Sequence, residues 1–324
     1  MQADLPDSRF SRHLRSMATS HPTIAYFVTP HGFGHAARAC AVMQAMRLAR
    51  PDVRFEIFTT VPRWFFAESL SAAFGYHPLE TDIGLVQTSS LHEDLPATIR
   101  RLSAFHPFDP GLVRQVASHL RELRCSLVVC DIAALGIACA EAAGLPSALV
   151  ESFTWDWIYT GYLPALEERS EREQLQRVIH YLADWYVRAD YHIQTEPVCA
   201  PTVADLITPP VGRLRRQTPE ATRESLGIPH SARVVLLTMG GVPWSYGFVD
   251  RLTHHPDTCF VIPGGGDRRE RNGNVLMLPR QSGWYHPDLI AASDGVVGKV
   301  GYSTLAEVYQ AGKPFGYVLR PRFP

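Results

Sequence analysis

The sequence has no Cys-x-x-Cys pair, no long apolar run, and almost no excess of either charge. A membrane helix needs about 18 or more apolar residues in a row, so we expect no membrane span. The formal net charge of −1 gives no general attraction to nucleic acid or to an anionic membrane surface. Any binding must therefore depend on the local features of a site.

The cysteines lie mostly inside apolar stretches and lack the spacing of a disulfide framework or a metal site. We interpret them as reduced core residues of a cytoplasmic protein, and we see no metal motif. The first residues carry arginines and serines without an apolar core, so no secretory signal is predicted. Met17 could be the true start, and residues 1–21 are expected to form a flexible tail. The cysteines are Cys40, Cys125, Cys130, Cys139, Cys199 and Cys259.

A chain of 324 residues with 46% hydrophobic content is long enough for two domains with sizeable cores. Short apolar runs alternate with segments of helical period, which predicts βαβ units on mostly parallel sheets. Prolines stiffen a connection that ends near Gly212, where we place the domain boundary. The predicted domains are residues 22–212 and residues 213–324.

Residues 24–46 read as a strand, a glycine-containing turn and an alanine-rich helix. Gly32 and Gly34 permit backbone angles that a Cβ would forbid, and the free N–H groups of the helix start suit an anion. His31 and His35 flank the turn and could titrate near neutral pH. The alternatives stay open, because such turns often only connect elements and either histidine could be structural.

Two further features follow strands of the first half. Asp131 ends a buried strand, at the edge where parallel sheets bind ligands, but it could instead cap the helix predicted over residues 133–143. The segment 153–159 gathers aromatic residues, among them Trp155, beside Asp156. Such a cluster is usually core, and it could also line an acceptor pocket.

The second half opens a new series of strands, at residues 234–238, 259–262 and 275–278. Two of these strands end in glycine-rich turns, where a ligand could approach the backbone. The glycines assigned to a ligand site are Gly240, Gly241 and Gly265.

A later strand leads into a turn that begins at Lys299, and a helix follows it. Gly301 loosens the turn, and Ser303 or Thr304 can cap the helix, whose free N–H groups offer a second anion site. Glu307 lies one turn into the helix and could reach a ribose diol. It could also be a surface carboxylate near the helix start.

Residues 287–317 contain Asp-Leu-Ile-Ala-Ala-Ser-Asp, Gly-Lys-Val-Gly-Tyr-Ser-Thr-Leu-Ala-Glu and Ala-Gly-Lys-Pro-Phe. They resemble the nucleotide-sugar-binding segment of the two-lobed (GT-B) glycosyltransferases of the family 28 type, which use UDP-type donors. Residues 31–38, 153–159 and 298–307 are more similar still to the glycosyltransferase-like amino-terminal part of plant L-arabinokinases. The likeness covers nearly the whole chain from Ile24, without a kinase portion.

The resemblance implies two Rossmann-like, doubly wound α/β domains that face a cleft. It implies that His35 acts as a base steadied by Asp131, that Glu307 faces the ribose, and that the nucleotide-sugar is a substrate, with no cofactor. Lys299 departs from the glycine run of the family, although a lysine suits a diphosphate. The residues implied to face the donor diphosphate are Gly301, Ser303 and Thr304. The residues assigned to the acceptor side are His31, Gly32, Gly34, Trp155 and Asp156.

The family pattern continues beyond the point where this sequence stops, shortly after the strand predicted at residues 316–319. We therefore expect the second domain to be truncated, with apolar surface exposed. Three functions follow from the resemblance: a hexosyl-type transferase acting on an acceptor hydroxyl, a non-catalytic nucleotide-sugar-binding module, and a nucleotide-sugar epimerase. They differ in whether the donor is consumed and whether an acceptor is needed.

Overall fold

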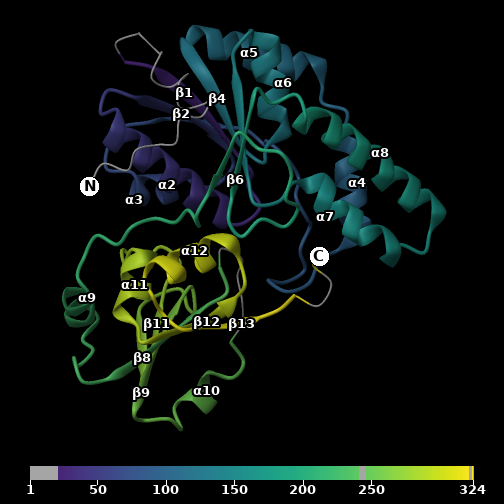
Figure 1. Cartoon of the computed structure of the whole chain (residues 1–324). Coiled ribbons are helices and arrows are strands. Elements are labelled where there is room, and N and C mark those ends of the chain that lie inside the picture. The colour runs from purple at the N-terminus through teal and green to yellow at the C-terminus, as the bar shows by residue number, and fades with distance from the viewer. Residues whose placement is uncertain (1–20, 241–245, 321–322, 324) are drawn as a thin grey trace.

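The computed structural model describes residues 21–240, 246–320 and 323, and its strands form two sheets. Figure 1 shows the sheets as two bodies, one above the other. The first sheet is parallel throughout, in the order β3-β2-β1-β4-β5-β6-β7. Its strands are β1 (Thr23–Val28), β2 (Arg54–Thr59), β3 (Gly75–Pro78), β4 (Cys125–Asp131), β5 (Ser147–Glu151), β6 (Tyr191–Thr195) and β7 (Leu206–Thr208).

The second sheet has the order β10-β11-β9-β8-β12-β13, and only the pair β10 and β11 is antiparallel. Strand β13 forms one edge, where Tyr317 and the following Leu319 are exposed. The strands are β8 (Arg233–Thr238), β9 (Thr258–Pro263), β10 (Glu270–Asn272), β11 (Val275–Leu278), β12 (Gly295–Lys299) and β13 (Phe315–Val318).

Helices pack around both sheets, and α12 of the second half packs against α2 of the first. In the described part of the chain, none of the helices has the length and apolar character to cross a bilayer. The helices of the first half are α2 (Gly34–Ala49), α3 (Arg63–Ser69), α4 (Leu95–Phe105), α5 (Pro110–Glu122), α6 (Ala134–Ala143), α7 (Trp155–Tyr162), the 3-10 turn η1 (Leu163–Ala165) and α8 (Arg169–Tyr186). Those of the second half are α9 (Pro219–Leu226), α10 (Val249–Leu252), α11 (His286–Ala292) and α12 (Tyr302–Gln310).

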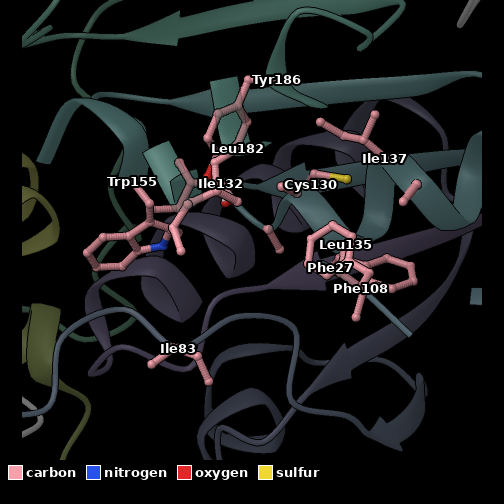
Figure 2. Close-up of a cluster of buried hydrophobic side chains, with 14 of the residues drawn as sticks. Phe27, Ile83, Phe108, Cys130, Ile132, Leu135, Ile137, Trp155, Leu182 and Tyr186 are labelled. Atoms are coloured by element: carbon pink, nitrogen blue, oxygen red, sulfur yellow. Dashed lines mark hydrogen bonds between the residues drawn. The ribbon is translucent and has the colours of Figure 1, made fainter. Parts of the chain in front are cut away.

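Strand β1 shows why the first sheet is covered on both faces. All six of its residues are buried, and successive side chains point to opposite faces of a sheet. Ala25 and Phe27 join the core cluster on one face, and Ile24, Tyr26 and Val28 join the cluster on the other. Figure 2 shows the first of these clusters, in which Phe27 lies with Leu135 and Ile137 of α6 and with Phe108, which precedes α5.

The α/β class and the two mostly parallel sheets are confirmed, but several short elements were missed. Strand β7 and helix α4 were not predicted. Strands β3 and β10 and the four-residue α10 were also not predicted. The boundary near Gly212 stays a proposal, and the prediction for residues 1–20 lies outside the described residues.

Candidate active site between the two sheets

His35, Asp131 and Arg38 form one buried network at the ends of β1 and β4. The Asp131 carboxylate accepts a hydrogen bond from His35 Nδ1 at 2.7 Å. Arg38 grips the same carboxylate through Nε at 2.8 Å and Nη2 at 2.7 Å. The remaining nitrogen of Arg38, Nη1, donates to Ser152 and Thr195. The three side chains therefore hold one another in a fixed geometry.

Electrostatics sets the protonation of this network. Burial alone would raise the pKa of Asp131, but the Arg38 charge and hydrogen bonds outweigh it and hold that pKa below its ordinary value. An ionised carboxylate can only accept, so His35 Nδ1 carries the proton and Nε2 is left as a lone-pair acceptor. Arg38 Nη2 also lies 3.4 Å from Nδ1, but a guanidinium cannot donate to a protonated nitrogen. The 2.7 Å contact with Asp131 therefore determines the tautomer of His35. Burial lowers the pKa of His35, which keeps the ring neutral.

The helix-cap interpretation of Asp131 is wrong. Ala133 occupies the N-cap position of α6, and no side chain caps that helix. Arg38 was missed from the sequence, although a signal was present. A lone arginine lies among alanines three residues after His35, and this spacing puts both side chains on one face of α2.

Across the cleft from this network lies the start of α12. A single pocket is lined by residues 31–35 of the first half and residues 299–304 of the second, and we call it the cleft pocket. The approach is close, because a Cβ placed on Gly34 would lie 3.3 Å from Ser303 Oγ. The predicted acceptor-side turn and the predicted donor turn therefore face each other.

Lys299 supplies a cation to the cleft pocket. It makes no ion pair with any residue that the structure describes. Arg320, also from the second half, lines the same pocket. Burial, together with the Arg320 charge, lowers the pKa of Lys299 to about 8. Ser303 and Thr304 line the pocket as predicted, but they do not cap α12. Gly301 holds the N-cap position, without a side-chain cap, so the free N–H groups remain available.

The glycine assignments in the second half need one change. Gly240, with φ of +74°, lines the cleft pocket, whereas Gly241 lies outside the described residues. The lining of a second, adjacent pocket includes Gly264 rather than Gly265. Gly265 is close-packed instead, since a Cβ there would lie 2.8 Å from Ile262.

Glu307 is 3% exposed, so the interpretation as a surface carboxylate is wrong. Its Oε1 accepts from Arg213 Nε at 2.8 Å, and its Oε2 lies 3.0 Å from His286 Nδ1. Arg213 also donates to Ser69 Oγ at 3.0 Å, which links the second half to α3. Glu307 lines the second pocket together with Trp284. Its predicted contact with a ribose stays a proposal.

The aromatic segment 153–159 divides between pocket and core. Phe153 lines the cleft pocket, but Trp155 is 1% exposed and donates to Asp82 at 3.2 Å. Figure 2 shows Trp155 within the buried cluster. Asp156 lines neither the cleft pocket nor the second pocket. Trp155 and Asp156 therefore do not form the surface of the predicted acceptor pocket.

Among the described residues, no group of histidine, cysteine and carboxylate side chains is arranged to hold a metal ion.

No protein-family model matches the chain. An L-arabinokinase of Arabidopsis thaliana is 30% identical over 314 residues, which cover 95% of this chain and 29% of that protein. The chain thus spans less than a third of the length of this relative. The predicted resemblance to plant L-arabinokinases is confirmed.

Several solved structures match most of the chain. The spinosyn forosaminyltransferase SpnP has a TM-score of 0.58 at 15% identity and matches 91% of this chain and 80% of its own. UGT2 of Phytolacca americana, complexed with UDP-2fluoro-glucose and pterostilbene, has a TM-score of 0.58 at 15% identity, with 92% and 80% covered. The glycosyltransferase of kitacinnamycin reaches 0.59 at 16% identity, with 92% and 80% covered.

The chain has the GT-B fold. In this GT-B chain the first sheet carries the His35 network, and the second carries Lys299 and the α12 start. The cleft between the two sheets is therefore where the predicted residues of both halves come together.

Proposed function

We propose that this chain binds a UDP-type sugar in the cleft and transfers a hexosyl-type sugar to an acceptor hydroxyl. One observation carries the proposal: the unprotonated Nε2 of His35 and the unpaired cation of Lys299 belong to the same pocket but to opposite sheets. A base for the acceptor and a positive charge for the leaving group are the two needs of this reaction. A related fold holds UDP-2fluoro-glucose and a second small molecule in Phytolacca americana UGT2.

The proposed step uses the groups of the cleft pocket directly. His35 Nε2 takes the proton of the acceptor hydroxyl while that oxygen bonds to the anomeric carbon. The bond from that carbon to the diphosphate breaks, and the diphosphate leaves with the electron pair. Lys299 and the free N–H groups of α12 neutralise the charge that develops on it. Asp131 stabilises the imidazolium that forms, as its hydrogen bond to Nδ1 allows.

The nucleoside would extend into the second pocket, which shares Ser303 and Thr304 with the cleft pocket. Glu307 lines this pocket and would accept hydrogen bonds from the ribose hydroxyls, and Trp284 and Phe33 offer ring faces for a base. These positions fit the donor-binding roles that the resemblance implies for Glu307, Ser303 and Thr304.

A second candidate function is a nucleotide-sugar-binding module without turnover. The observation that favours it is the pair of hydrogen bonds from Arg38 to Asp131, because a carboxylate that is already neutralised stabilises an imidazolium less. The L-arabinokinase relative is also much longer than this chain, so the similar region is one part of a larger protein. Donor consumption separates the two functions.

Calorimetric titration with UDP, ADP, GDP and their sugar conjugates tests the proposal first. We expect one nucleoside diphosphate to bind, and we expect its sugar conjugate to be consumed when hydroxyl acceptors are added. Binding without consumption across the acceptor panel would support the module. Absence of binding to every nucleotide would contradict both functions.

The affinity for UDP should fall as the pH rises through about 8, the pKa of Lys299. Below that pH the ammonium is charged and attracts the diphosphate, and above it the free protein must take up a proton to bind. Since the charged ammonium is the binding form, the affinity should fall about tenfold in total from about pH 7 to about pH 9, and the slope approaches about tenfold per pH unit only above the pKa. The terminal phosphate of UDP is mostly ionised throughout this range, because the second pKa of a phosphate ester is about 6. Calorimetry between pH 7 and pH 9, taken as about one unit either side of that pKa, measures the slope.

Lys299→Arg is the matched control, because a guanidinium keeps its charge throughout this range. Its UDP affinity should stay flat where that of the unchanged chain falls. An equal slope in both proteins would assign the pH dependence to another group.

A further inference from the structure

His31 is held from behind by the loop of residues 81–86. The backbone N–H of Leu85 donates to His31 Nδ1 at 3.3 Å. Gly84 makes this approach possible: its φ is +60°, and a Cβ there would lie 2.7 Å from Nδ1. Trp155 packs its edge against the imidazole, with 5.1 Å between ring centroids. The position of the ring and the hydrogen-bond partner of Nδ1 are therefore fixed.

The supporting loop is itself tied to the core. Asp82 accepts hydrogen bonds from Thr29 Oγ1 at 2.5 Å and from Trp155 Nε1 at 3.2 Å. Tyr159 donates to the Gly84 carbonyl at 2.8 Å. Ile83 and Trp155 belong to the buried cluster drawn in Figure 2. Trp155 and Tyr159, from the segment predicted to line an acceptor pocket, thus hold the loop that orients His31.

These contacts determine the tautomer of His31. A backbone N–H can only donate, so Nδ1 must be unprotonated. Burial lowers the pKa of His31 well below its ordinary value, and the positive charges of Lys299 and Arg320 act in the same direction. The ring is neutral and carries its proton on Nε2. No hydrogen bond from Nε2 to any other described residue is found, and His31 lines the cleft pocket.

The two histidines of the turn therefore have opposite roles. His35 gives its proton to Asp131 and offers a bare Nε2 to the pocket, whereas His31 accepts from the backbone and offers an Nε2–H. A bare nitrogen can act as a base, and a neutral N–H can only donate. His31 lines the same pocket as Lys299 and Arg320, so its N–H belongs to the cationic part of that pocket.

We propose that His31 Nε2–H donates a hydrogen bond to a phosphate oxygen of the bound diphosphate, and completes from the first sheet the anion site that Lys299 and α12 form on the second. This inference rests on the proposed function, because it takes the ligand to be a nucleoside diphosphate. It assigns His31 to the leaving group and not to the acceptor. Binding of the diphosphate would then join both sheets through one ligand.

The tautomers are measured without any ligand. In the ¹⁵N-histidine-labelled chain at about pH 7, long-range ¹H–¹⁵N spectra distinguish protonated from unprotonated ring nitrogens. His31 should appear as the neutral Nε2–H form and His35 as the neutral Nδ1–H form, assigned by the signals lost in His31→Gln and His35→Gln. A His31 ring protonated on Nδ1 would overturn the proposal.

Titration with inorganic pyrophosphate then tests the contact without assuming a base or a sugar. The Nε2 signal of His31 should shift on binding. By calorimetry, His31→Leu and His31→Asn should bind pyrophosphate about tenfold more weakly, because a hydrogen bond to a charged oxygen is lost. His31→Gln should recover most of that affinity, since its amide N–H can reach the position of Nε2. Equal affinities in Leu, Asn and Gln variants, or an unshifted Nε2 signal in bound protein, would overturn the proposal.

These outcomes differ from a failure of the proposed function. If pyrophosphate binds through His31 but no nucleotide does, the anion site stands and the nucleotide-sugar substrate is wrong. If nucleotides bind while every His31 variant keeps full affinity, the proposed function stands and His31 has no part in it. If neither pyrophosphate nor any nucleotide binds, both proposals are wrong.

Discussion

Replacing His35 with alanine is expected to lower donor consumption by roughly a hundred- to ten-thousand-fold, the range for loss of a general base. His35 Nε2 is the unprotonated ring nitrogen, because Nδ1 is bonded to Asp131 at 2.7 Å. The affinity for the nucleotide should change little, since none of the proposed donor contacts involves the His35 side chain. Turnover and nucleotide affinity measured on the same preparation check the two expectations.

His180→Ala is the matched control, because His180 is an exposed residue of α8. Its turnover and affinity should equal those of the unchanged chain. If His35→Ala consumes donor at the normal rate, His35 is not the base. If it loses nucleotide affinity as well, the pocket itself has been disturbed and the base role is not supported.

Arg38 makes this dyad different from a simple histidine and carboxylate pair. Its guanidinium neutralises Asp131 before any proton is transferred, and it is itself only 5% exposed. If His35 took up a proton, Asp131 would be shared between the imidazolium and the guanidinium, so it would stabilise the imidazolium less. Burial already lowers the pKa of His35, so as the proposed base it would be mild and would act on an acceptor hydroxyl only when the leaving group is well stabilised. The proposed reaction would therefore depend on Lys299 and α12 as much as on His35.

The regular parts of the fold could be predicted because their patterns are strong. The strand predicted at the start of residues 24–46 is mostly apolar and is followed by glycines, and the structure has β1 at Thr23–Val28. The elements that were missed have weaker signals. Strand β7 has three residues, and α10 has four. Helix α4 does have a signal, since Asp94 caps it and Pro96 follows in its first turn, but the polar stretch before it concealed the start.

The sequence located both halves of the site but not the residues that support them. The pairing of His35 with Asp131 was implied by resemblance, and the structure brings these side chains together. Asp82 and Arg213 lie in irregular segments, where no periodicity indicates the direction of a side chain. Trp155 shows the opposite error, because a residue next to a strand end was assigned to the pocket while its indole is buried. Contacts between residues distant in sequence decide such cases.

Arg213 and Glu307 form a buried ion pair whose loss should strongly destabilise the chain. Their side chains are 4% and 2% exposed, and the Nε to Oε1 distance is 2.8 Å. Arg213 also bonds to Ser69, and its guanidinium lies within 5.0 Å of the ring centroids of Phe65 and Tyr285. Glu307→Ala leaves this cation buried without its carboxylate. The expected loss in the free energy of unfolding is about 3 to 5 kcal/mol.

Arg213→Met should cost less, because Glu307 keeps its hydrogen bond to His286 and can take up a proton. The double variant Arg213→Met/Glu307→Ala removes both charges, so its loss should be smaller than the sum of the single losses. Urea unfolding of the four proteins gives the coupling between the two residues. The exposed pair Arg169–Glu173 of α8, at 2.7 Å, is the control, and Glu173→Ala should cost only about 0.3 to 0.5 kcal/mol. A Glu307→Ala chain as stable as Glu173→Ala would mean that the buried pair contributes nothing, and Glu307 would then be free to serve the ligand alone.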